Sequence, residues 1–107
     1  MFIPLLRPRP KADVEFAGRF LAERSTMSRA DAELVDRIVD TLKKKPNAGA
    51  DQEFMDTPAG VMLARKQDGV YALYQLFTKE PPRPFLLRFW YCGRYNLIDG
   101  RDVYDFE

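Results

Sequence analysis

The sequence predicts an α+β fold in which two N-terminal helices pack on a small antiparallel β-meander of three to four strands. Two patterns support this prediction: a long amphipathic helical pattern lies in the first half of the chain, and three strand-like apolar runs separated by turn residues follow in the second half. Ten of the fourteen aromatic residues lie after position 70, which places most of the core, or a contact surface, in the strands. Helices that precede a meander are typical of a two-layer α+β domain.

The length of 107 residues and the hydrophobic fraction of 46% indicate one domain, which we expect over residues 12–107. We expect residues 1–11, MFIPLLRPRPK, to form an extended arm, because three prolines interrupt any helical pattern. Two interpretations of this arm stay open. It lies on the body of the domain, or its basic residues reach a partner.

The first helix is expected over residues 13–24. Val14, Ala17, Phe20 and Leu21 share one helical face in this segment. A short strand at residues 14–16 that runs into the helix is the alternative.

The second helix has the clearer pattern. Ser28 is the expected N-cap, with Asp31 three residues later, and Pro46 ends the helix. One apolar stripe runs along it, made of Leu34, Val35, Ile38, Val39 and Leu42. Three lysines, Lys43 to Lys45, fall in the last turn, where they complement the helix dipole; a phosphate contact is the alternative role for them.

Three strands are expected at residues 61–66, 70–78 and 84–92, joined by turns at residues 67–69 and 79–82. The segment 47–60 contains Asn, Gly and Pro and is expected to be a loop. The tail after Gly93 is expected to add one more short strand or a turn of helix.

Composition excludes several classes of site. The chain has no histidine and one cysteine, Cys92, so we expect no metal site, no cofactor and no Ser-His-Asp triad, and we expect Cys92 to be a small buried apolar residue. No apolar run of 18 residues exists, and Pro4 and Arg7 interrupt a secretory signal. We therefore expect a cytoplasmic protein that does not bind a membrane.

Three segments resemble the RelE/HigB-type toxin superfamily: VDTLKKKPNAGADQEFMDTPAGVMLAR, DGVYALYQLF and PFLLRFWYCGRYNLIDGRDVY. The resemblance lies in a helix that ends before a Pro/Gly loop, followed by a Gly, a basic strand and two further strands, over residues 13–106. It implies a RelE-like fold. It also implies a metal-independent, ribosome-dependent endoribonuclease whose Lys, Arg and Tyr side chains orient mRNA and stabilise the charge of the transition state.

The chain departs from that family where the chemistry would lie. Met62 and Leu63 stand where the family has adjacent basic residues, and Tyr71 stands where it has an Arg on the next strand. The remaining candidate catalytic residues are Arg65, Lys66, Arg88, Arg94, Arg101 and Tyr104. The net charge of +1 also differs from the strongly basic surface that ribosome binding favours.

Two hypotheses follow. The first is a small non-catalytic binding or inhibitory protein on a RelE-like scaffold, encoded by a phage or mobile element and directed at a host protein complex. Its contact residues would come from the aromatic strands: Tyr71, Tyr74, Phe77, Arg88, Phe89, Trp90 and Tyr91. The alternative is an mRNA interferase of a toxin–antitoxin pair, with the ribosome, mRNA and an antitoxin as partners. A homodimer through a sheet edge is compatible with either hypothesis.

Overall fold

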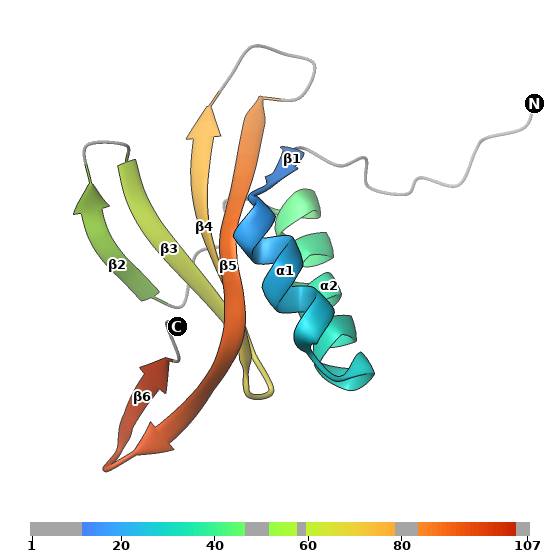
Figure 1. Cartoon of the computed structure of the whole chain (residues 1–107). Helices are drawn as coiled ribbons and strands as arrows, with labels where there is room; N and C mark the ends of the chain where they lie inside the picture. The colour runs from blue at the N-terminus through green and yellow to red at the C-terminus, as the bar shows by residue number, and fades with distance from the viewer. Residues whose placement is uncertain (1–11, 47–51, 58–59, 79–83, 105–107) are drawn as a thin grey trace, which may run out of the picture.

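The structure is a computed structural model that describes residues 12–46, 52–57, 60–78 and 84–104 (Figure 1). The expected N-terminal arm, residues 1–11, lies outside these described residues. The elements follow the chain in the order β1 (Ala12–Phe16), α1 (Gly18–Thr26), α2 (Arg29–Lys44), β2 (Gln52–Thr57), β3 (Gly60–Gln67), β4 (Val70–Thr78), β5 (Phe85–Ile98) and β6 (Arg101–Tyr104).

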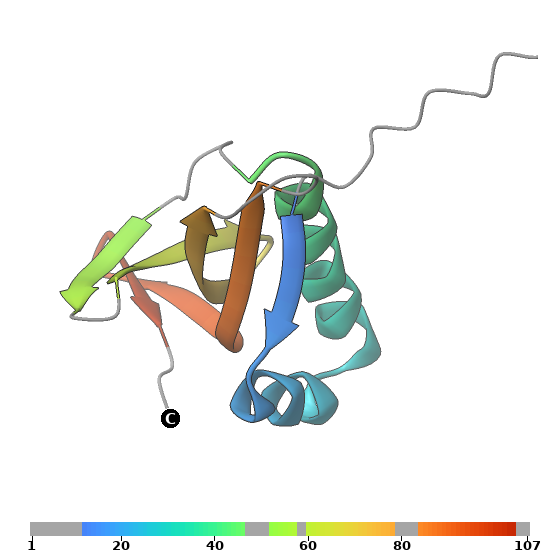
Figure 2. The ribbon, with the colours of Figure 1, turned by 90° about the horizontal axis from the view of Figure 1, so that it is seen from above.

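The strands form one mixed sheet with the order β1-β5-β4-β3-β2, and β6 pairs with the far end of β5. β1 is parallel to β5, whereas the β2/β3, β3/β4, β4/β5 and β5/β6 pairs are antiparallel. Both helices cover the same face of the sheet, as the view from above shows (Figure 2). The expected α+β class with two helices is thus confirmed.

Three parts of the expected arrangement are wrong. A strand precedes the helices, so the chain does not begin with a helical half, and this strand makes the sheet mixed instead of purely antiparallel. Part of the expected loop 47–60 is the edge strand β2. The third expected strand continues through Gly93 to Ile98, because the buried Gly93 pairs with Tyr71 inside the ladder.

β1 settles the alternative left open at residues 14–16 in favour of a strand. Ala12 and Val14 alternate with polar residues and pack into the core, and every residue of β1 pairs with β5. The helix begins only at Gly18, after the N–H of Ala17 donates a 2.9 Å hydrogen bond to the carbonyl of Phe89. The parallel strand therefore fixes the start of α1 against the middle of β5.

α2 agrees closely with its prediction. The Ser28 hydroxyl accepts a hydrogen bond from the Asp31 N–H at 3.2 Å, which satisfies one of the free N–H groups at the helix start. The helix ends at Lys44, two residues before Pro46. Four residues of the expected stripe are fully or almost fully buried against the sheet: Val35, Ile38, Val39 and Leu42.

Two tight hairpin turns have the same sequence, Asp-Gly. Asp68 and Gly69 have φ values of 49° and 92°, and Asp99 and Gly100 have 51° and 77°. Consecutive positive φ values favour Asn or Asp followed by Gly and match the twist of the flanking strands. The first turn lies where the sequence predicted it. The second turn joins β5 to β6, so the tail after Gly93 forms a short strand and not a turn of helix.

The core lies between the helices and the central strands β4 and β5. Tyr74, Leu87 and Phe89 are fully buried on the helix-facing side. Cys92 is also fully buried, as expected, and its thiol lies 3.6 Å from the carbonyl of Phe20. β4 is buried on both of its faces, because the neighbouring residues Val70, Tyr71 and Ala72 all have no exposed surface.

Candidate functional site

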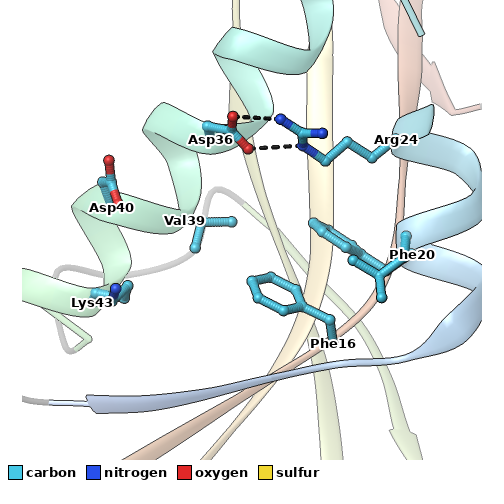
Figure 3. A pocket seen from close by; sticks show the side chains of 8 residues that line it. Phe16, Phe20, Arg24, Asp36, Val39, Asp40 and Lys43 are labelled. Atoms are coloured by element: carbon cyan, nitrogen blue, oxygen red, sulfur yellow. Dashed lines mark hydrogen bonds and ion pairs between the residues drawn. The ribbon is translucent and has the colours of Figure 1, made fainter. Parts of the chain in front are cut away.

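The candidate site is a groove between the two helices, which we call the α1–α2 groove (Figure 3). Its volume is about 450 Å³, within the ~300–1,000 Å³ that is typical of binding pockets. It draws on three elements and is lined by Phe16, Phe20, Leu21, Arg24, Asp36, Val39, Asp40 and Lys43.

Aromatic rings make the floor of the groove. The ring centroids of Phe16 and Phe20 are 5.1 Å apart, and Phe89 lies beneath them at 5.6 and 5.4 Å. Tyr74 continues the cluster at 5.7 Å from Phe89. Rings at these separations stack favourably. Because the floor is an extension of the hydrophobic core, the groove is formed before anything binds to it.

The groove exposes apolar side chains. Phe16 is 42% exposed and Leu21 is 51% exposed, whereas their neighbour Phe20 is buried. α1 buries only this one residue against the sheet, so its other apolar residues, Leu21 and Ala22, remain exposed. Adjacent exposed apolar side chains at a concave site indicate an interaction surface.

An ion pair between α1 and α2 closes one end of the groove (Figure 3). The Arg24 guanidinium donates two hydrogen bonds to the Asp36 carboxylate, from Nε at 2.9 Å and from Nη2 at 2.6 Å. The hydrogen bond to Asp36, and then its negative charge, raise the pKa of Arg24 above its usual value. Arg24 therefore keeps its charge, and the pair stays intact, from neutral to alkaline pH.

We expect this ion pair to position the helices and to add little stability. Arg24→Ala, Asp36→Ala and the double variant should give a coupling free energy of about 0.2–1 kcal/mol, because both side chains are partly exposed and water screens the charges. Urea unfolding of the four proteins measures the coupling, and added salt should reduce it. A coupling of several kcal/mol would contradict this expectation.

Asp40 and Lys43 form the open side of the groove on α2. Neither side chain has an ion-pair partner among the residues that the structure describes. They lie three residues apart, on one face of the helix. The open side therefore carries charges that are available to a bound molecule.

The aromatic contact residues expected from the sequence are mostly core residues. Tyr74 and Phe89 face the helices and are fully buried. Tyr71 and Tyr91 lie on the opposite face of the sheet, in ring contact at 6.1 Å, but they are 0% and 5% exposed. Burial removes these four residues from any surface for a partner, which corrects the expectation.

The other expected contact residues lie on the face of the sheet opposite the helices. Arg88 lies over the rings of Phe77 and Trp90 at 5.2 and 5.8 Å and forms an ion pair with Glu15. The Trp90 N–H donates a 2.7 Å hydrogen bond to the buried side chain of Gln75. All three expected residues are only partly buried, but the polar groups of Arg88 and Trp90 are already engaged within the protein.

The cations expected for RNA cleavage are divided between the two faces of the sheet. Arg65 pairs with the core residue Ala72, and Arg94 forms an ion pair with Asp31 of α2, so both lie on the helix side. Lys66 pairs with Tyr71 on the other face and lies over the ring of Tyr95 at 5.3 Å. Arg88 also lies on that face.

The backbone of Tyr104 is part of β6, and its side chain is outside the described part. Arg101, also on β6, is exposed. The four cations on β3 and β5 therefore do not converge on one point, as stabilisation of a single phosphorane requires.

The groove residues were missed because each pattern had a simpler explanation. Leu21 falls on the apolar face of the expected first helix, yet it is half exposed. Asp36 and Asp40 are ordinary polar positions of an amphipathic helix. The only sequence signal was the composition of α1, which offers too few apolar positions to bury a whole helical face.

Comparison with known proteins finds no family model, no curated protein and no solved structure that matches the chain. Within residues 12–46, 52–57, 60–78 and 84–104, no group of three or more Cys, Asp or Glu side chains could hold a metal ion. None of the helices described is both long and apolar enough to cross a lipid bilayer.

Proposed function

We propose that this chain is a non-catalytic binding protein that uses the α1–α2 groove to hold a segment of a protein partner. The observation that carries the proposal is the exposure of Phe16, which belongs to the preformed aromatic floor, and of Leu21 beside it. Apolar anchors that fill such pockets dominate the affinity of many protein interfaces. The charged rim around the floor is typical of a binding site that also selects its partner.

The proposal includes a RelE-like scaffold that has lost the endoribonuclease activity of the family. Two consecutive helices followed by the antiparallel strands β3, β4 and β5 support the scaffold. The loss of nuclease activity is supported by the placement of the cations, because Arg65 and Arg94 lie on one face of the sheet and Lys66 and Arg88 lie on the other. On this proposal the protein inhibits a host protein complex, as small proteins of phages and mobile elements do.

Capture of the partner from a lysate of the source organism tests the groove. The immobilised wild-type chain should retain a protein in stoichiometric amount, and Leu21→Glu should weaken its binding by at least about 30-fold, because a buried charge replaces an apolar anchor worth ~2 kcal/mol. Ile98→Glu is the matched control. Ile98 is exposed to the same 51%, but it lies on the β5–β6 hairpin, and its substitution should leave binding unchanged.

The same experiment can overturn the proposal. No partner on the wild-type chain, or equal retention by wild type and Leu21→Glu, would remove the groove as the binding site. A translation reaction with purified ribosomes addresses the alternative. Specific cleavage of mRNA by the wild-type chain, lost in Arg65→Ala/Arg94→Ala, would establish a nuclease instead.

A further inference from the structure

We propose, on the basis of the proposed function, that the partner segment binds as an extended strand, which pairs with the free edge of β1 and places a large apolar side chain in the α1–α2 groove. Three features lead to this inference: the unpaired edge of β1, the position of the groove beside that edge, and the acidic side chains on the opposite face of the strand. The edge selects the conformation of the partner segment, and the groove selects its side chain.

One edge of β1 carries backbone groups that no described strand uses. β1 is the last strand in the order of the sheet, and among the residues that the structure describes it pairs only with β5. Phe16 pairs with Phe89, and the next residue, Ala17, donates its N–H to the Phe89 carbonyl. Because successive residues of a strand point their N–H and C=O groups to opposite sides, Val14 and Phe16 point theirs away from β5. A row of such groups is a template on which another strand can pair.

The α1–α2 groove lies beside this edge. Phe16 is the last residue of β1 and lines the groove, and β1 runs along one side of it while α2 forms the other side (Figure 3). Val14 and Phe16 both turn their side chains to the helix side, where they meet the core and the ring of Phe20. Neighbouring strands lie ~4.8 Å apart and place alternate side chains on one face, so a strand paired with β1 would turn every second side chain towards the groove. The groove volume of about 450 Å³ is sufficient for a large apolar side chain.

The opposite face of β1 is acidic. Asp13 and Glu15 alternate with Val14 and therefore lie on the face away from the helices, where Arg88 of β5 binds Glu15 at 2.9 Å. Antiparallel pairing of two β1 strands about Val14 would place Asp13 of each copy opposite Glu15 of the other, and like charges in this arrangement are destabilising. A second copy is therefore a poor occupant of the edge. A partner strand that carries Lys, Arg or uncharged residues on this face avoids the repulsion and complements the two carboxylates.

A random peptide library displayed on phage selects candidate segments without knowledge of the partner. Peptides retained by the wild-type chain should share a large apolar residue whose two neighbours are not acidic, with Lys or Arg enriched at these neighbouring positions. A synthetic peptide of that consensus, measured by fluorescence anisotropy, should bind Leu21→Glu at least about 10-fold more weakly than wild type, because its apolar side chain enters the groove.

N-methylation of the peptide backbone tests the strand pairing itself. In a strand that pairs with β1, every second N–H of the peptide faces β1 and the others face solvent. A methyl group on an N–H that faces β1 should weaken binding by about 10-fold, because it removes a hydrogen bond of the ladder, whereas a methyl group at an intervening position should weaken it by less than about 3-fold. The intervening positions are the matched control, since they receive the same methyl group. The expected result is therefore a loss of affinity at every second position.

Glu15→Gln tests the acidic face. This variant should bind the consensus peptide about 3-fold more weakly than wild type, because one carboxylate beside the Lys or Arg of the peptide is lost. Glu33→Gln is the matched control, because Glu33 is an exposed residue of α2 that does not line the groove. Its substitution should leave the affinity unchanged. Equal effects of the two variants would overturn the charge preference.

The outcomes separate this inference from the proposed function. A peptide that requires Leu21 but loses affinity at every N-methylated position, or at none, would overturn the strand pairing and leave the groove as a binding site. Selection of no peptide that requires Leu21 would overturn both. A dimer of the chain in light scattering that the peptide dissociates would assign the edge to a second copy and would also overturn the inference. Thermal unfolding of each variant, monitored by circular dichroism, excludes loss of the fold as the cause.

Discussion

Phe89→Ala is expected to lower the free energy of unfolding by about 3–5 kcal/mol, the range for loss of a fully buried Phe side chain. Phe89 has no exposed surface, and its ring lies 5.4–5.7 Å from the rings of Phe16, Phe20 and Tyr74. Its removal leaves a cavity where β1, α1, β4 and β5 meet. Small domains have a total stability of only ~5–15 kcal/mol, so this single change should remove a large fraction of it.

Phe16→Ala is the matched control for this prediction. Phe16 belongs to the same ring cluster and pairs with Phe89 across the β1/β5 ladder, but it is 42% exposed. Its truncation should cost about half as much, because less apolar surface returns to water. Urea unfolding curves give both values. Equal losses for the two variants would show that Phe89 is not the centre of the cluster.

Ile38→Asp is expected to abolish stable folding, with a loss of about 4 kcal/mol or more. Ile38 is 1% exposed and lies on the stripe of α2 that faces the sheet. A carboxylate at this position would lose its hydration without gaining a partner, which is among the most costly single changes. Far-UV circular dichroism at increasing urea concentrations measures the loss.

Arg37→Asp separates burial from helix propensity. Arg37 is the next residue towards the N-terminus of α2 and is exposed. The change places the same side chain on the same helix, so burial is the main difference between the two variants. We expect the free energy of unfolding to fall by only about 0.5–1 kcal/mol, which includes mild repulsion from the other acidic residues of the helix. A comparable loss in the two variants would mean that α2 does not dock on the sheet through Ile38.

Sequence patterns predicted the elements that are stabilised by interactions between near neighbours in the chain. Ser28 and Pro46 bracket α2 because capping and the missing proline N–H act within one turn of the helix. The Asp68-Gly69 turn is equally local, since its positive φ values suit these residues. β1 shows the limit of such arguments. Val14 fits both a helical face and a strand alternation, and the pairing with β5 selects the strand.

The site was predicted less well because its residues are brought together by long-range contacts. The groove joins the end of β1, one face of α1 and the second half of α2, and only the apolar-poor composition of α1 hints at an uncovered surface. The expected contact aromatics failed for a related reason. A strand that is covered on both faces has no polar alternation to show which side is exposed, and β4 is such a strand.

A bulge in β5 changes which side chains face the helices. Leu73 pairs with Tyr91 and Tyr74 pairs with Phe89, so Trp90 is an extra residue in the ladder. Strict alternation would place Phe89 and Tyr91 on one face. The bulge instead keeps Phe89 in the core under α1 and turns Tyr91 to the other side, with Cys92 facing the helices.

The sequence by itself determined the α+β class, the limits of α2, the first hairpin turn and the burial of Cys92. Each of these follows from contacts between near neighbours or from composition. The tertiary structure alone decided the parallel β1/β5 pairing, the exposed face of each strand and the α1–α2 groove. Their physical cause is contact between distant segments, such as the ion pair of Glu15 with Arg88, 73 residues apart. Such contacts form only when both segments are folded together, so the sequence of either segment alone shows no pattern that predicts them.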